Sequence, residues 1–471
     1  MTAATAIDRP IRDIASALRS GEVKATEIAE VVVDRQHRLE PDLHAYRTFD
    51  EAQTRRQAAV ADAALAAGYD MGPLHGIPTS VKDLYGVTGY DVWAGTPRRL
   101  PESWEREGPV VTALRRGLGV VTGKTHTVEF AFGGLGLNPH WEVPRNPWDA
   151  ERHRAPGGSS SGAGVSLWEG TAMLAFGSDT AGSVRVPACW TGTFGLKTSF
   201  GRWSLDGIVP LSPSLDTAGI LTRSADDAAV AFSVLDPLVA PSGREFLQRV
   251  GHAEPGGFAV AVCDWMFEDC GPGVAETVQD AIRKLEAAGV KVRKLELPQV
   301  AEAYEVFRAG GLTGIEFAAF INGPMKEWRT SLDPNVLERF GKIEQVTAIE
   351  YLARKRRMTK LAADMRTAMT GVDMIVGPTV PITAPVVDEV KEGRDYVRAN
   401  MATLRNTSVG NLLEMCGATL PVGLASDSLP IGLMLSAPLG EDEKVVAASL
   451  AFERVLGRPL DILGRPPRIP A

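Results

Sequence analysis

The sequence predicts an α/β fold: a single large domain whose central mixed β-sheet is covered by helices on both faces. Short apolar runs that are typical of buried strands alternate with longer segments in which apolar residues recur at helical spacing. No linker rich in Pro, Gly or Ser divides the 471 residues, and 44% of them are hydrophobic, which allows a large core. We therefore expect one domain over residues 1–471, with a helical excursion at about 235–360.

Helices are expected where apolar side chains return every three or four positions. The stripe of Val274, Val278, Ile282 and Leu285 is the clearest, and Gly289 just beyond it is a typical helix stop. By the same criterion, helices are predicted at residues 26–38, 51–67, 274–285 and 441–455.

Strands are expected where short apolar runs are bounded by turn residues. These runs occupy residues 119–126, 258–263, 290–297, 373–381 and 431–435. The runs at 258–263 and 290–297 flank a predicted helix and therefore indicate a βαβ unit, which joins parallel strands. This unit favours a largely parallel or mixed sheet.

The charge of the chain limits its partners. Fifty Lys and Arg residues against 58 Asp and Glu residues give a net charge of -8, which disfavours nucleic acid and anionic membranes. The N-terminus carries Asp8 and Asp13 and lacks a secretory signal, and no run of about 18 apolar residues is present. We expect a cytoplasmic protein. The four cysteines show no C-x-x-C spacing and are expected to be reduced core residues.

The stretch "APGGSSSGAG" at residues 155–164 places three hydroxyls where the backbone is least constrained. A flexible linker is disfavoured because apolar sequence, first helix-like and then strand-like, follows it. A phosphate loop of the Walker type ends in Gly-Lys-Ser/Thr, and no lysine lies between Lys124 and Lys197. A nucleophile elbow must follow a buried strand, whereas the polar "DAERHRAP" precedes this stretch. The remaining interpretation is that these hydroxyls assist a nucleophile elsewhere in the chain.

Two further stretches supply the missing parts. In "GSDTAGSVRVPA" at 177–188, small residues allow several backbone N–H groups to converge on one anion, and Ser183 ends this nest. A serine in that place is well positioned to attack a carbonyl, because the same N–H groups would hold the oxyanion. "GIPTSVKDLYGV" at 76–87 contains Lys82 in an otherwise apolar setting. No metal-ligand spacing accompanies these stretches, so neither a metal nor a cofactor is expected.

Together these stretches resemble the amidase signature family of serine hydrolases. Residues 157–202 read "GGSSSGAGVSLWEGTAMLAFGSDTAGSVRVPACWTGTFGLKTSFGR". This is similar to the family's G-G-S-S-[SG]-G element and its G-[ST]-D-x-[GA]-G-S-[IV]-R-x-P element. "GIPTSVKD" resembles the family's lysine motif, and "DMIVGPTVP" and "LPIGLML" resemble its later strands. The resemblance covers nearly the whole chain.

By motif position, the resemblance implies a Ser-cisSer-Lys triad. Ser183 would be the nucleophile, Ser159 the bridging serine beside a cis peptide bond, and Lys82 the base. A lysine acts as a base only when neutral, so its pKa must fall from about 10.4 to about 7–8, and burial among apolar neighbours would cause such a fall. Asp179 and Arg185 are expected to brace the loop that carries the nucleophile.

The resemblance also implies an oxyanion hole formed by the backbone N–H groups of Thr180, Ala181, Gly182 and Ser183. Most members have Gly at the position of Ala181, and a methyl group is tolerated there only if φ is negative. His75, at the edge of the lysine motif, is interpreted as structural.

Substrate contacts are expected from the segment "FAFGG" at residues 130–134 and from Val186, which lies three positions after the nucleophile. The candidate substrate-binding residues are Ala131, Phe132, Gly133, Gly134 and Val186.

The implied function is hydrolysis of a carboxylic amide in a small molecule, or of a related C–N acyl bond such as a carbamate or anilide, giving an acid plus an amine or ammonia. The alternative is the glutaminase (A-type) subunit of a tRNA-dependent amidotransferase, which shares the fold and the triad. Those subunits commonly have Gln where this chain has Val186, and an apolar residue fits an apolar or bulky acyl group better than it fits glutamine selection. A homodimer is left open as the assembly state.

Overall fold

The centre of the molecule is one mixed sheet of eleven strands. The structure, a computed structural model, describes residues 2–470 apart from the side chains at 338–339 and 341–342. The strands follow the order β1-β3-β2-β4-β6-β5-β10-β11-β9-β7-β8 across the sheet. Their bounds are β1 Tyr46–Phe49, β2 Pro78–Lys82, β3 Val120–Thr125, β4 Leu174–Asp179, β5 Phe194–Lys197, β6 Thr217–Thr222, β7 Ala259–Val262, β8 Lys291–Lys294, β9 Met374–Pro378, β10 Cys416–Leu424 and β11 Pro430–Ala437.

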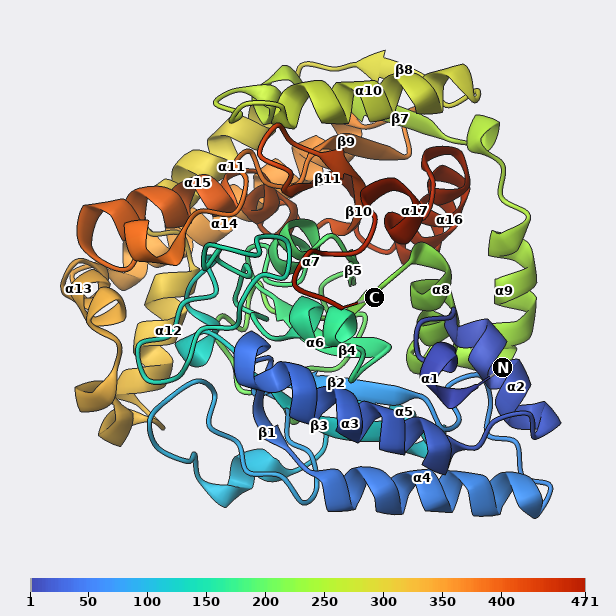
Figure 1. The fold of residues 1–471 in the computed structure, drawn as a ribbon. Helices are drawn as coiled ribbons and strands as arrows, with labels where there is room; N and C mark the ends of the chain where they lie inside the picture. The colour runs from blue at the N-terminus through green and yellow to red at the C-terminus, as the bar shows by residue number, and fades with distance from the viewer. Residues whose placement is uncertain (1, 471) are drawn as a thin grey trace.

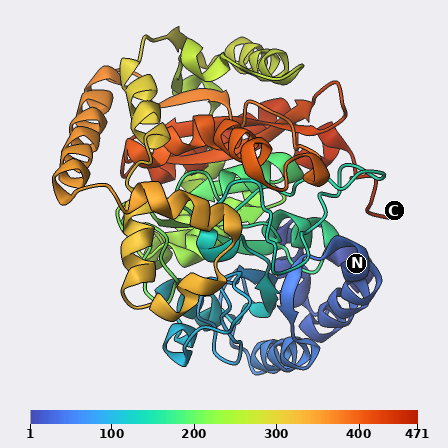
Figure 2. The same ribbon diagram turned by 90° about the vertical axis from the view of Figure 1, so that its left-hand side faces the viewer.

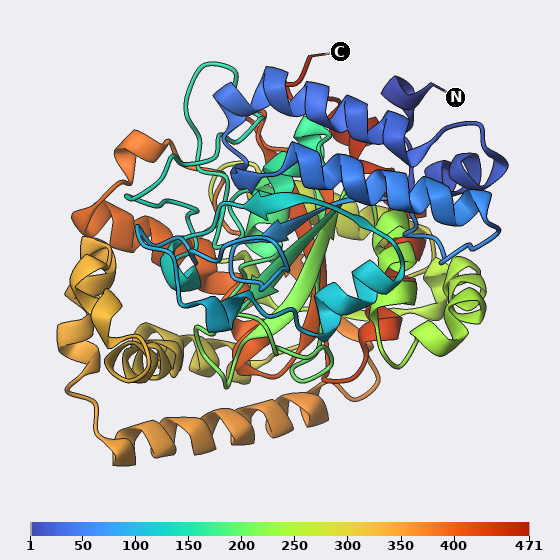
Figure 3. The ribbon, with the colours of Figure 1, turned by 90° about the horizontal axis from the view of Figure 1, so that it is seen from below.

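Helices cover both faces of this sheet, which confirms the fold class predicted from the sequence (Figures 1 and 3). Their bounds are α1 Ala3–Ala6, α2 Ile11–Ser20, α3 Ala25–Leu43, α4 Glu51–Ala66, α5 Pro109–Arg116, α6 Ala163–Glu169, α7 Arg185–Thr191, α8 Ala225–Leu235, α9 Gly243–Gly251, α10 Val274–Ala287, α11 Pro298–Arg308, α12 Thr313–Asn322, α13 Pro334–Ile343, α14 Ala348–Ala368, α15 Gly393–Leu412, α16 Asp442–Leu456 and α17 Pro459–Leu463. Across residues 2–470, none of the helices has both the length and the apolar character needed to cross a membrane.

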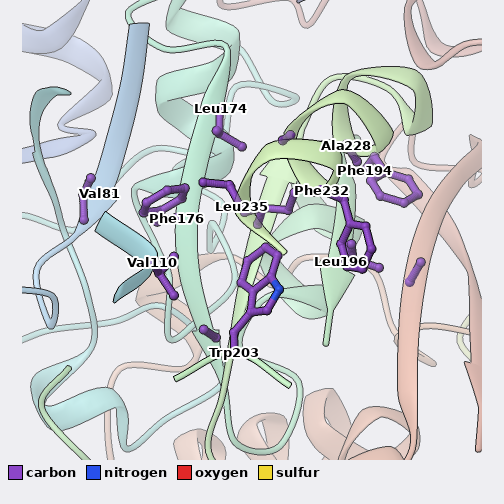
Figure 4. Packing of buried hydrophobic residues seen from close by; sticks show 14 of the residues in the cluster. Val81, Val110, Leu174, Phe176, Phe194, Leu196, Trp203, Ala228, Phe232 and Leu235 are labelled. Atoms are coloured by element: carbon purple, nitrogen blue, oxygen red, sulfur yellow. The ribbon is translucent and has the colours of Figure 1, made fainter. Parts of the chain in front are cut away.

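Strand β4 shows how both faces of the sheet are buried. Successive side chains of a strand point to opposite faces. Leu174 and Phe176 pack on the side of α8, where Phe232 belongs to the same cluster (Figure 4). Ala175, between them, packs instead with Ala163 and other residues of α6 and α7. Because neither face is left to solvent, the first three residues of the strand and the two before it, residues 172–176, form a continuous apolar run in the sequence.

The pairing of β2 with β4 fixes where the signature motifs meet. The two strands are parallel, with Val81 opposite Phe176. Their C-terminal ends therefore lie at the same edge of the sheet, and the chain leaves that edge at Lys82 and at Asp179.

A group of helices projects from one side of the sheet. Helices α11 to α14 lie at the left in Figure 1 and are seen from that side in Figure 2. The helical excursion was expected at about 235–360, but β7 and β8 fall within that range and belong to the sheet. The part without strands therefore begins at α11 and ends with α14.

The predicted elements correspond to observed ones, although some bounds differ. The helices are α3, α4, α10 and α16, and the strands are β3, β7, β8, β9 and β11. The strand predicted at 290–297 is limited to Lys291–Lys294, because the chain turns into α11 at Pro298. Strand β10 was not predicted, since Gly417, Pro421 and Gly423 interrupt its apolar pattern.

Candidate active site

Lys82 ends β2, and its side-chain nitrogen lies against two serine hydroxyls. Nζ donates to Ser159 Oγ at 2.7 Å and to Ser178 Oγ at 3.0 Å. All three side chains are buried, with Lys82 and Ser159 fully so. The structure therefore brings together two of the three residues that the sequence assigns to the triad, and adds Ser178 beside them.

Burial changes the acid–base behaviour of this lysine. It lowers the pKa of Lys82 to about 7, because the ammonium group loses its hydration in the interior. The carboxylates of Asp179 and Asp216 act in the opposite direction and offset only part of this effect. Near neutral pH a substantial fraction of Lys82 is therefore uncharged, and an uncharged amine has a lone pair that accepts a proton.

The serine-glycine stretch packs against a neighbouring loop at backbone distance. The peptide bond between Gly158 and Ser159 is cis. The Gly158 N–H donates to Gly134 O at 2.7 Å, and a Cβ added to Gly158 would lie 2.6 Å from the nitrogen of Gly136. There is no room for a side chain at this position, which explains why a glycine stands immediately before the bridging serine.

Ser160 joins this stretch to the loop that carries Ser183. Its Oγ donates to Ser183 O at 2.6 Å. The Ser183 hydroxyl has no hydrogen-bond partner within residues 2–470, and Ser159 Oγ accepts from Lys82 rather than bonding to Ser183 Oγ. The link between the two serines that the resemblance implies is thus not formed, although the two loops are in contact.

The buried carboxylate of Asp179 holds the shape of the loop from 180 to 185. It accepts from the N–H groups of Gly182 at 2.8 Å and Val184 at 3.1 Å. The Arg185 guanidinium donates to both of its oxygens, at 3.0 and 3.1 Å. These positive and donor groups hold the pKa of Asp179 well below its ordinary range, although burial alone would raise it. Asn411 of α15 adds a further donor.

The four N–H groups expected to form the oxyanion hole are not equivalent. The Gly182 N–H is already committed to Asp179. The N–H groups of Thr180, Ala181 and Ser183 have no hydrogen-bond partner in the part of the chain that the structure describes. The candidate set is therefore reduced to these three groups.

Ala181 and Gly182 occupy very different backbone conformations. Ala181 has a negative φ, so the methyl group in place of the usual Gly causes no strain. Gly182 has φ of +131°, and a Cβ there would lie 2.2 Å from Thr407 Oγ1. Thr407 in turn donates to Ala181 O at 2.7 Å. Helix α15 therefore holds the loop through Thr407 as well as through the contact of Asn411 with Asp179.

A cavity of about 620 Å³ opens onto Ser183. Ala131, Phe132 and Gly133 line it, as the sequence predicted. Its other walls come mainly from α11, α12, α13, α14 and α15, which the sequence did not connect with the site. The residues that complete its lining are Thr180, Ala181, Leu211, Phe307, Arg308, Ala309, Gly310, Thr313, Gly314, Ile315, Ile343, Val346, Arg354, Val397, Asn400, Met401 and Leu404.

Three residues near the motifs do not line this cavity. Gly134 uses its N–H to bond Asn400 Oδ1 at 2.7 Å and its carbonyl to bond Gly158. Val186 is fully buried at the start of α7 and packs in the core. His75 uses its Nε2 for Ala61 O and its Nδ1 for the Met71 N–H. Of the five candidate substrate-binding residues, Gly134 and Val186 thus support the loops without reaching the cavity.

Asp216 is a buried acid of this site that sequence reasoning missed. Its Oδ1 accepts from Thr180 Oγ1 at 2.5 Å, and its Oδ2 accepts from the N–H groups of Leu211 and Ser212. Burial raises the pKa of Asp216 to about 6 in spite of these donors. No motif marks Asp216, because it lies just before β6 and is 36 residues away in the sequence from Thr180, which it contacts.

Comparisons with known proteins agree over almost the full length of the chain. The sequence model of the amidase family matches residues 27–446. A 2-amino-5-chloromuconic acid deaminase from Comamonas testosteroni is 45% identical over 458 residues, which cover 96% of this chain and 97% of the relative. The A-type subunit of a glutamyl-tRNA(Gln) amidotransferase from Thermobifida fusca (strain YX) is 29% identical over 482 residues, which cover 94% of this chain and 95% of the relative. A crystal structure of an amidase matches with a TM-score of 0.85 at 30% identity, covering 95% of this chain and 100% of that chain.

The Asp179–Arg185 pair predicts a strong effect on stability. Asp179→Ala leaves the buried guanidinium and several N–H groups without an acceptor, so we expect the free energy of unfolding to fall by about 3–5 kcal/mol. Denaturant-induced unfolding followed by fluorescence measures this change.

Asp280→Ala is the matched control, because it removes an exposed carboxylate paired with Lys284 at 2.8 Å on the surface of α10. The control should unfold as the wild type does. Equal stability of the two variants would show that the Asp179 carboxylate does not hold the loop.

Proposed function

Because this chain belongs to the amidase family, we propose that it hydrolyses a carboxylic amide, or a related C–N acyl bond, of a small molecule through an acyl-enzyme on Ser183. Lys82 is the base, and Ser159 carries protons between Lys82 and Ser183. The observation that carries the proposal is the buried contact of Lys82 Nζ with Ser159 Oγ at 2.7 Å, in a setting that lowers the pKa of the lysine to about 7.

Acylation begins with the proton of the Ser183 hydroxyl. Lys82 in its neutral form takes the proton of Ser159, and Ser159 takes that of Ser183, so Ser183 Oγ can attack the carbonyl carbon. This step requires the two serine hydroxyls to come into contact when substrate binds, and the Ser183 hydroxyl is available for it because it has no other hydrogen-bond partner in the described residues. Ser160, which bonds Ser183 O, keeps the main chain in place meanwhile.

The tetrahedral intermediate places a negative charge on the former carbonyl oxygen. The N–H groups of Thr180, Ala181 and Ser183 are the proposed donors, since each is without another partner in the described part of the chain. The C–N bond then breaks, and the proton held by Lys82 passes through Ser159 to the leaving nitrogen. Deacylation uses the same proton path. Water attacks the acyl carbon while its proton passes through Ser159 to Lys82, and Lys82 then returns a proton through Ser159 to the Ser183 oxygen, which leaves as the acid is released.

The relatives bear on the choice between the two functions considered from the sequence. The deaminase is 45% identical to this chain, whereas the amidotransferase subunit is 29% identical. This difference favours an enzyme that acts alone, and we propose ammonia as the leaving group on the strength of that relative. Val186 contributes less than expected to the argument, because its side chain lies in the core and does not contact the cavity.

A substrate panel tests this choice. We expect the purified chain alone to release ammonia from small primary amides, measured by a coupled ammonia assay, without tRNA or another subunit. The contrary result is a chain that is inert on every simple amide and cleaves glutamine only when a second subunit is added.

Ser183→Ala should abolish acylation. We expect kcat/KM to fall by at least about a thousandfold, because no other group can form the acyl-enzyme. A fluorophosphonate probe, with mass spectrometry of the labelled peptide, should modify the wild type at Ser183.

Ser161→Ala is the matched control. It removes a buried hydroxyl from the run of three serines at residues 159–161, and this hydroxyl does not bond Lys82. The Ser161→Ala protein should still be labelled by the probe at Ser183. Labelling that persists in Ser183→Ala would assign the nucleophile to another residue.

The rate of acylation should rise with pH. Lys82 is a base only without its proton, and its pKa is lowered to about 7. The rate should therefore be low well below pH 7, climb through this value and level off above it. Lys82→Arg should be inactive across this range, because arginine stays protonated. Profiles of kcat/KM against pH measure both, and substantial activity of Lys82→Arg would exclude a neutral lysine as the base.

A further inference from the structure

The wall of the cavity formed by α11, α12 and α14 differs in charge from the wall around Ser183. Two arginines line it, Arg308 at the end of α11 and Arg354 in α14. Among the lining residues that the structure describes there is no Asp or Glu. Both charged residues among those that line the cavity are therefore cations, although Arg308 is paired with Glu305, and the rest of the lining is largely apolar.

Thr313, the first residue of α12, has an unsatisfied hydroxyl at this wall. Thr313 is one of the residues that line the cavity, it is 7% exposed, and its Oγ1 is buried without a hydrogen-bond partner. Buried polar groups in native proteins normally have a partner. An unpartnered hydroxyl in a cavity wall indicates that a ligand supplies the missing acceptor.

The start of α12 offers further donors beside this hydroxyl. The residue before the helix is Leu312, which has no side-chain oxygen to cap it. The N–H groups of Thr313 and Gly314 have no acceptor within the described residues, whereas those of Ile315 and Glu316 bond Leu312 O. The N-terminus of a helix carries a partial positive charge, so these free N–H groups attract an anion.

The acidic residues near this wall are directed elsewhere. Glu305 pairs with Arg308 at 3.0 Å on the exposed surface. Glu316 accepts from the Ser212 hydroxyl and from Tyr351. Glu350 accepts from Thr347 in the cap of α14. Arg354 donates to Gly311 O at 3.2 Å, which holds it beside the turn that leads into α12.

From these contacts we propose a carboxylate-binding site at the start of α12, formed by Thr313 Oγ1, the free N–H groups of Thr313 and Gly314, and the guanidinium of Arg354, with Arg308 as a second cation. It binds a carboxylate that the substrate carries at the end remote from the scissile C–N bond. This inference rests on the proposed function, because it assumes that the same cavity presents the reacting group to Ser183. The substrate class is then the monoamide of a small dicarboxylic acid.

A matched pair of substrates tests the site. Adipic acid monoamide and adipamide have the same length and release ammonia from the same group, but only the monoamide has a carboxylate. We expect Arg354→Gln to raise KM for the monoamide by about 10- to 100-fold, the range for a charge-assisted hydrogen bond, with kcat little changed. Thr313→Val, which removes only the hydroxyl, should raise it by about 3- to 10-fold. Both variants should raise KM for adipamide much less than KM for the monoamide, because the neutral amide gains no charge-assisted bond.

Two further variants control for fold and charge. Arg356→Gln removes an exposed arginine of the same helix that does not line the cavity, and should behave as the wild type. Arg354→Lys keeps the positive charge and should recover part of the lost affinity. If Arg354→Gln does not fold, Thr313→Val decides. Equal effects of Arg354→Gln and Arg356→Gln, or equal losses on both substrates, would overturn the site.

A binding measurement separates this inference from the proposed function. Calorimetric titration with adipate should show binding to the wild type and much weaker binding to Arg354→Gln, whereas the affinity for adipamide should differ far less between the two proteins. If adipate binds in this way but the fluorophosphonate probe does not label Ser183, the site stands and the acyl-enzyme proposal fails. If Ser183 is labelled but adipate and adipamide bind alike, the carboxylate site fails. If acetate binds the wild type more tightly than Arg354→Gln, but the wild type has the same KM for the monoamide and adipamide, the site binds a free anion. This result would overturn its assignment to the substrate.

Discussion

The carboxylate of Asp179 is the group on which the geometry of the site depends. It follows the last apolar residues of β4 and accepts from Gly182, Val184 and the Arg185 side chain, so the chain turns around a single buried charge. The turn leaves the N–H groups of Thr180, Ala181 and Ser183 without acceptors and places Ser183 at the cavity. The same charge also raises the pKa of Lys82, but burial outweighs it.

The site combines two environments that favour opposite charge states. Behind Ser159 the fold buries Lys82 fully, and burial lowers its pKa to about 7, which suits a base. At the other end Arg354 and the uncapped start of α12 keep their positive character and suit an anion. This difference in charge would orient a substrate that has a neutral amide at one end and a carboxylate at the other, independently of shape complementarity. The helices from α11 to α14 therefore supply selectivity to a reaction centre built on the sheet.

The sequence predicted the contact between Lys82 and Ser159, because both residues lie in short motifs with fixed spacing, and the structure places them 2.7 Å apart. The apolar runs of β3, β7 and β9, and the stripe of α10, were predicted correctly, since each is buried in a regular pattern. Contacts across long separations were not readable: Asp216, Thr407 and Thr313 reach the site from β6, α15 and α12 without a motif. Val186 shows the converse limit, since its position in the motif did not reveal that α7 turns it into the core.

The central claim is that Lys82 is uncharged at the pH at which the enzyme works, and titration of this side chain by NMR tests it most directly. Lysines labelled with ¹³C at Cε would be followed against pH, and Lys82→Arg would identify the signal. The account predicts a midpoint near the value of about 7 that burial produces, well below that of the exposed lysines. A Lys82 signal that titrates together with the exposed lysines would contradict it.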